Sequence, residues 1–122
     1  MASVFETTAG KAIGYTEGLG SAVTQETSKA TGVTINAPCG AITTDDAELA
    51  GAAEVSFVVT NSFVAATDVP VVAVKSGATT GTYVASVSAV AAGSFTITLS
   101  NLGSTASEAL VLNYAVIKAA AA

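Results

Sequence analysis

Strict alternation of side-chain types over one short stretch is the feature that most constrains the fold. In residues 94–100 the apolar side chains of Phe95, Ile97 and Leu99 alternate with hydroxyl residues. Because successive side chains of a β-strand point to opposite faces, this period of two predicts a strand with one face in a core and the other in water. The residue types favour strands, and helical spacing is absent. The stretch is therefore expected to be a half-buried strand.

Similar runs recur along the chain, each bounded by residues that favour turns. In the short connection 91–93, Gly93 suits the positive φ of a tight hairpin. The further candidate strands cover residues 22–28, 32–36, 41–44, 54–60, 69–76, 82–91 and 108–118. About eight strands predict an all-β chain that forms a single antiparallel β-sandwich or jelly roll.

The length of 122 residues leaves room for one hydrophobic core. We expect an extended N-terminal arm at residues 1–20, a β-sandwich domain at 21–118 and a C-terminal tail at 119–122. The arm carries scattered glycines among polar residues without a sustained period, which is typical of a segment that becomes ordered on a partner.

The composition holds more apolar residues than one core needs. Hydrophobic residues make up 51% of the chain and charged residues 11%, whereas soluble domains average about 25% charged. No apolar run reaches the roughly 18 residues of a membrane-spanning helix, and the N-terminus lacks the features of a signal peptide. We therefore expect no membrane partner, and burial between subunits is the remaining outlet for the apolar surplus.

Two of the expected strands, residues 69–74 and 109–117, are apolar on both faces. This pattern suits a strand with the core on one side and a neighbouring subunit on the other. The candidate residues of an oligomer interface are Val69, Val71, Val72, Val74, Leu110, Leu112, Tyr114 and Val116.

Charge and residue types exclude several functions. The net charge of −5 repels phosphate backbones, so no nucleic-acid partner is expected. Histidine, the commonest general base and zinc ligand, is absent. The N-terminal glycines follow neither the dinucleotide nor the phosphate-loop spacing. We assign no catalytic, cofactor-binding or metal residues, and we expect the protein not to be an enzyme.

Two features still leave chemistry to consider. The single cysteine, Cys39, has no basic residue near it in sequence and is expected to be a buried, inert thiol. Asp45, Asp46 and Glu48 form the one acidic cluster. Cation binding remains open there, but the ligand spacing of a calcium loop is missing. The favoured interpretation is that Thr44 or Asp45 caps a short turn.

Most of the chain, about residues 13–118, resembles a family of small virion-associated proteins of tailed bacteriophages. The resemblance is carried by runs spread along the sequence: Gly14-Tyr15-Thr16, Ala22-Val23-Thr24-Gln25, Thr27-Ser28-Lys29, Thr31-Gly32-Val33-Thr34-Ile35-Asn36, Cys39-Gly40-Ala41-Ile42-Thr43, Val55-Ser56-Phe57, Thr60-Asn61-Ser62, Ala65-Ala66-Thr67-Asp68-Val69, Ser76-Gly77-Ala78, Val87-Ser88-Ala89-Val90-Ala91-Ala92-Gly93-Ser94-Phe95, Ser107-Glu108-Ala109 and Leu112-Asn113-Tyr114-Ala115-Val116-Ile117-Lys118.

This resemblance implies a non-enzymatic capsid decoration, or cement, protein. Its partners would be the major capsid protein and further copies of itself, as a homotrimer, on the capsid surface of a virion assembled in the bacterial cytoplasm. We expect the arm to contact the shell through Val4, Phe5, Ile13 and Tyr15. The near alternative is a trimeric head-fibre or tail-fibre knob that binds a host receptor or glycan. An immunoglobulin-like adhesin domain also remains open, because sandwiches host many functions.

Overall fold

The computed structural model describes residues 14–79 and 82–120. Eight strands lie in this part of the chain: β1 (Gly20–Thr24), β2 (Val33–Thr34), β3 (Cys39–Thr43), β4 (Glu54–Thr60), β5 (Val69–Ser76), β6 (Tyr83–Ala91), β7 (Ser94–Asn101) and β8 (Val111–Ile117). Within the same residues no helix is long and apolar enough to cross a membrane. The all-β prediction is confirmed.

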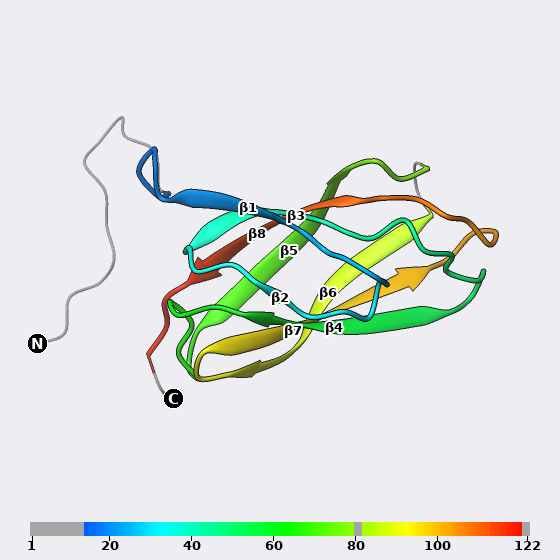
Figure 1. Cartoon of the computed structure of the whole chain (residues 1–122). Helices are drawn as coiled ribbons and strands as arrows, with labels where there is room; N and C mark the ends of the chain where they lie inside the picture. Colours follow the sequence, from blue (N-terminus) through cyan, green and yellow to red (C-terminus); the bar gives the residue numbers. More distant parts are fainter. Residues whose placement is uncertain (1–13, 80–81, 121–122) are drawn as a thin grey trace, which may run out of the picture.

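The strands form two four-stranded sheets that pack face to face (Figure 1). Sheet A has the order β1-β3-β8-β5, and sheet B has the order β2-β4-β7-β6. Each sheet contributes one face to a shared apolar core, as the sheets of a β-sandwich do. The predicted sandwich of about eight strands is confirmed.

Both sheets are mixed, because β1 pairs with β3 and β2 pairs with β4 in parallel. The other four strand pairs are antiparallel, as expected. The parallel pairs arise because the chain alternates between the sheets over its first four strands, so alternate strands run in the same direction. The short β6–β7 hairpin has Gly93 at φ 83°, as its sequence predicted.

The core confirms the alternation in residues 94–100. Phe95, Ile97 and Leu99 are almost completely buried on β7. From sheet A, Leu112 and Tyr114 of β8 meet them, and the rings of Phe95 and Tyr114 lie 5.6 Å apart. Burying an apolar side chain of this size contributes roughly 1.5–3 kcal/mol, so these strands hold the two layers together.

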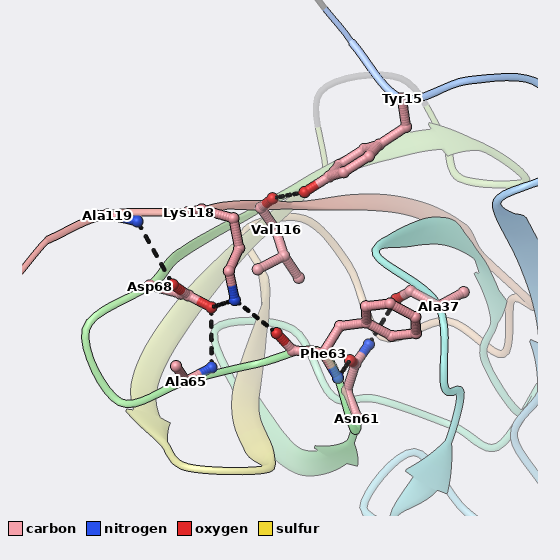
Figure 2. Close-up of polar contacts among 9 residues, drawn as sticks. All are labelled: Tyr15, Ala37, Asn61, Phe63, Ala65, Asp68, Val116, Lys118 and Ala119. Carbon is pink, nitrogen blue, oxygen red and sulfur yellow. Dashed lines mark hydrogen bonds and ion pairs between the residues drawn. The ribbon is translucent and has the colours of Figure 1, made fainter. Parts of the chain in front are cut away.

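Polar groups inside the core are hydrogen-bonded. The Asn61 side-chain amide donates to the Ala37 carbonyl at 2.8 Å, and its oxygen accepts the Phe63 N–H at 2.8 Å (Figure 2). The Tyr114 hydroxyl donates to the same Ala37 carbonyl at 2.6 Å. Burial is the main cause that raises the pKa of Tyr114 to about 12. These bonds tie the turn after β4 to the segment that leads into β3.

Candidate functional site

The candidate site is the outer face of sheet A, which points away from the core. We define this face by the side chains of Gly20, Ala22, Cys39, Ala41, Val69, Val71, Ala73, Asn113, Ala115 and Ile117. The strand register aligns Ala22, Ala41, Asn113 and Ala73 in one row and Gly20, Cys39, Ala115 and Val71 in the next. Asn113 is the only one of these ten residues with a strongly hydrogen-bonding side chain. The next row of the same face holds Thr24, Thr43 and Val111, so the face is mainly apolar, with hydroxyls toward one end.

Small residues make the middle of this face hollow. A shallow depression of about 850 Å³ lies over β1, β3, β8 and β5, lined mainly by glycine and alanine together with Cys39 and Asn113. Larger side chains stand at one end: Val69 is 50% exposed, Val71 45% and Ile117 53%. A contiguous apolar surface of this kind is typical of a protein contact.

The outer face of sheet B is chemically different. On β7 the outward side chains are Ser94, Thr96, Thr98 and Ser100. The Thr98 hydroxyl bonds to the hydroxyls of Ser56 and Ser88, each at 2.8 Å. Hydroxyl rows are well solvated, whereas the outer face of sheet A gains free energy by leaving water. The two faces therefore favour different surroundings.

Tyr15 fastens the entry of the chain to one end of sheet A. The N–H of Val116 donates to the Pro38 carbonyl, but Pro38 has no N–H to return the bond that an antiparallel pair would make. The Tyr15 hydroxyl donates to the Val116 carbonyl instead (Figure 2). This contact ties Tyr15, which lies within the predicted arm of residues 1–20, to sheet A, and β1 begins at the last residue of that range, Gly20.

An ion pair closes the same end of the sandwich. Lys118 contacts Asp68 at 2.5 Å and also donates to the Phe63 carbonyl at 2.8 Å (Figure 2). The hydrogen bond from Lys118, followed by those from the N–H groups of Ala65 and Ala119, holds the pKa of Asp68 below its ordinary value. The side chain of Asp68 is 1% exposed, so the pair pins the residues after β8 against the turn that precedes β5.

A buried lysine organises the opposite end. Lys29 is 3% exposed, and its ammonium group donates to the carbonyls of Asp45, Ala47 and Glu108 at 2.5–2.7 Å. Burial lowers the pKa of Lys29, while the carboxylates of Asp45, Asp46 and Glu108 act in the other direction. The buried Gln25 side chain assists, because it donates to the Thr31 carbonyl and accepts the Asp45 N–H.

No family model, curated protein or solved structure matches the chain. The function is therefore inferred from the arrangement of this chain's own residues.

The structure places only part of the predicted oligomer interface on the surface. Val69 and Val71 lie on the outer face of sheet A, as expected. Leu110, Leu112, Tyr114 and Val116 are at most 4% exposed and belong to the core, so they were wrongly assigned to a subunit contact. Val72 and Val74 also point inward and pack against the core. The physical reason is that alternate residues of β5 and β8 face opposite ways, and the outward members of β8 are Asn113, Ala115 and Ile117.

The other predicted residues have mixed outcomes. Val4, Phe5 and Ile13 lie outside the described residues, and Tyr15 contacts the body of the same chain. Cys39 is only partly buried and lines the depression, so the prediction of a buried thiol was wrong.

In the acidic cluster, the Asp45 carboxylate accepts the Ala47 N–H at 2.8 Å, whereas the Thr44 hydroxyl accepts the Leu110 N–H. Residues 44–48 form no regular turn or helix, so the capping interpretation holds only for the Asp45 hydrogen bond. In residues 14–79 and 82–120, no three His, Cys, Asp or Glu side chains are grouped to hold a metal ion. Sequence reasoning missed Lys29 and Gln25 because nothing in the local pattern marks them as buried.

Proposed function

We propose that the protein is a non-enzymatic capsid decoration protein of a tailed bacteriophage, which assembles with copies of itself and stabilises the shell by binding its outer surface. The observation that carries the proposal is the outer face of sheet A, an apolar surface on a compact sandwich whose other outer face is rich in hydroxyls. The resemblance noted in the sequence supports the phage context.

A rigid module of this kind suits a structural role. Both ends of the sandwich are fastened by buried polar contacts, which hold the longer connections between strands. A protein that binds only the assembled shell stabilises that shell by mass action, without chemistry of its own. The proposed partners are further copies, which the outer face of sheet A contacts, and the major capsid protein, which residues 1–13 contact. The homotrimer stays a prediction.

Copy number in purified particles tests the role. A decoration protein is expected in numbers comparable to those of the major capsid protein, measured by quantitative mass spectrometry of intact virions. A count matching a few fibres per particle would instead favour the trimeric knob that binds a receptor or glycan. Absence from the particle would contradict both roles.

Shell binding tests the contact. Full-length protein is expected to co-sediment with undecorated shells and raise their melting temperature. A variant lacking residues 2–13 is expected to keep its circular dichroism spectrum and its oligomeric mass but to lose co-sedimentation. Full binding by this variant would contradict the role given to the N-terminal residues, and its unaltered spectrum serves as the folding control.

A further inference from the structure

Among residues 14–79 and 82–120, β1 has no strand beside its outer edge, whereas the other three sheet edges carry protecting features. Sheet edges invite pairing with further strands unless proline, charge, a bulge or shortness blocks them. β5 carries Pro70 and Lys75 and has a register shift between Val74 and Ser76. β6 has a register shift between Val87 and Ala89, and β2 is only two residues long. β1 has a regular register, no proline and no charged residue.

The direction of the main-chain groups of β1 follows from its pairing. The Gln25 N–H donates to the Thr43 carbonyl on β3. Because N–H and C=O groups of alternate residues point to opposite sides of a strand, Val23 also faces β3, while Ala22 and Thr24 present their main-chain groups to the free edge. All residues of β1 except Val23 are exposed, so the described part of the chain does not cover this edge.

The strands at this side of the sandwich carry no charge. Residues 18–25 and 30–44, which include β1, β2 and β3, contain no Asp, Glu, Lys or Arg. The chain nevertheless has a net charge of −5. Pairing at this edge therefore buries no charged side chain within β1, and the exposed Glu17 and Glu26 that flank the strand lie at the two solvent-exposed ends of the contact, where salt screens their repulsion.

We propose that β1 pairs with β1 of a second copy, antiparallel and across a two-fold axis at Ala22, so that two sheets A join into one continuous sheet. This register sets Ala22 opposite Ala22 and Gly20 opposite Thr24. Each such pair exchanges two N–H···O bonds, so all outward main-chain groups of β1 are used. A two-fold contact is self-complementary by construction. It leaves the outer face of sheet A open, and so it is compatible with a second contact through that face.

The side chains fit this pairing. Gly20, Ala22 and Thr24 are small, and none of them carries a charge. Shifting the register by two residues would bring Gly18 opposite Thr24, and Gly18 has φ 90°, which is not extended backbone. The register centred on Ala22 is therefore the one that uses the whole strand.

Proline at position 22 tests the proposal. Ala22→Pro removes an N–H that has no partner among the described residues of the same chain, at an edge position where proline is tolerated. The mass of the full-length protein by native mass spectrometry is expected to fall by half relative to wild type. Ala22→Val, which keeps the N–H and favours a strand, is the matched control and is expected to retain the wild-type mass. A wild-type protein that stays monomeric at its highest soluble concentration overturns the proposal, and so does a mass that Ala22→Pro leaves unchanged.

Hydrogen exchange gives a second measurement that does not depend on the folding of a variant. In wild-type protein, protection of the Ala22 and Thr24 amides is expected to rise with protein concentration. The amides of Val23 and Gln25 are bonded to β3 and serve as internal controls, with protection independent of concentration. Equal, concentration-independent exchange of Ala22 and Thr24 would overturn the pairing.

Discussion

At the scale of single residues, buried polar side chains decide how the loops are held. The Lys29 ammonium group donates hydrogen bonds to three loop carbonyls. The Asn101 side-chain amide likewise donates to the carbonyls of Leu49 and Ser104. The sequence predicted the burial of Phe95 because its neighbours alternate with it. It did not predict the burial of Lys29, since the carbonyls that surround its ammonium group come from segments up to 79 residues away.

Replacing Lys29 tests this arrangement. Lys29→Met keeps much of the side-chain volume but leaves three carbonyls without their donor. We expect the free energy of unfolding to fall by about 3 kcal/mol, because buried groups that lose their hydrogen bonds are costly. Urea denaturation measures the change. Lys75→Met, which removes an exposed lysine from β5, is the control and is expected to have little effect.

Tyr114 makes stability depend on alkaline pH. Its pKa is raised from 10.0 to about 12, with burial as the main cause, so the folded protein keeps the hydroxyl proton at pH values where the unfolded chain releases it. The free energy of unfolding is therefore expected to fall as pH rises from about 10 toward 12. Denaturation series in wild type and Tyr114→Phe check this. The decline should be shallower in the variant, and equal slopes would contradict the assignment.

At the scale of strands, the sequence predicted where strands lie better than which way they face. Alternation and turn residues located all eight strands. Residues 69–74 and 109–117 were recognised as apolar on both sides, but a strand that is apolar on both faces does not reveal which face meets the core. That choice depends on the sheet partner, and it is why Leu112 was assigned outward and Ala115 was overlooked. Local sequence patterns could not predict the pairing of β1 with β3 either, because this pairing follows from the path of the chain between the two sheets.

The entry of the chain into β1 depends on Tyr15. Tyr15→Phe removes the hydroxyl that bonds to the Val116 carbonyl, and the ring remains. We expect amide exchange in residues 16–20 to become several-fold faster, because one net hydrogen bond contributes about 1 kcal/mol. The amides of β7 provide the reference and are expected to be unaltered. Unchanged exchange at residues 16–20 would show that the ring alone holds the segment.

At the scale of the whole molecule, the main feature is the chemical contrast between its two outer faces. One face is apolar and hollow, and the other is lined with hydroxyls. This contrast arises only when β1, β3, β5 and β8 come together, so no single strand of the sequence displays it. Experiments can distinguish the proposed role on a shell from the alternative role in a fibre. Substitutions can also test the outer face of sheet A on its own.

A charge on the apolar face tests self-association there. Val71→Lys places an ammonium group beside the depression, and burying it without a partner would cost at least about 3 kcal/mol. We expect the association constant for contacts through this face to fall by roughly 100-fold or more, measured by sedimentation equilibrium. Ser86→Lys adds the same charge to the outer face of sheet B and is expected to leave association unchanged. Equal effects of the two variants would mean that net charge, and not the face, controls association.

The position of Pro70 has a consequence for growth into fibres. Val116 bonds toward β3, so Pro70, which lies opposite it on β5, has its missing N–H on the far edge of sheet A. A fibre that grows by strand addition needs two unprotected edges on every sheet that it joins. Sheet A has a blocked edge at β5, and so strand addition at β1 ends with a closed pair. A chain that is half apolar can thus stay at high concentration without seeding amyloid.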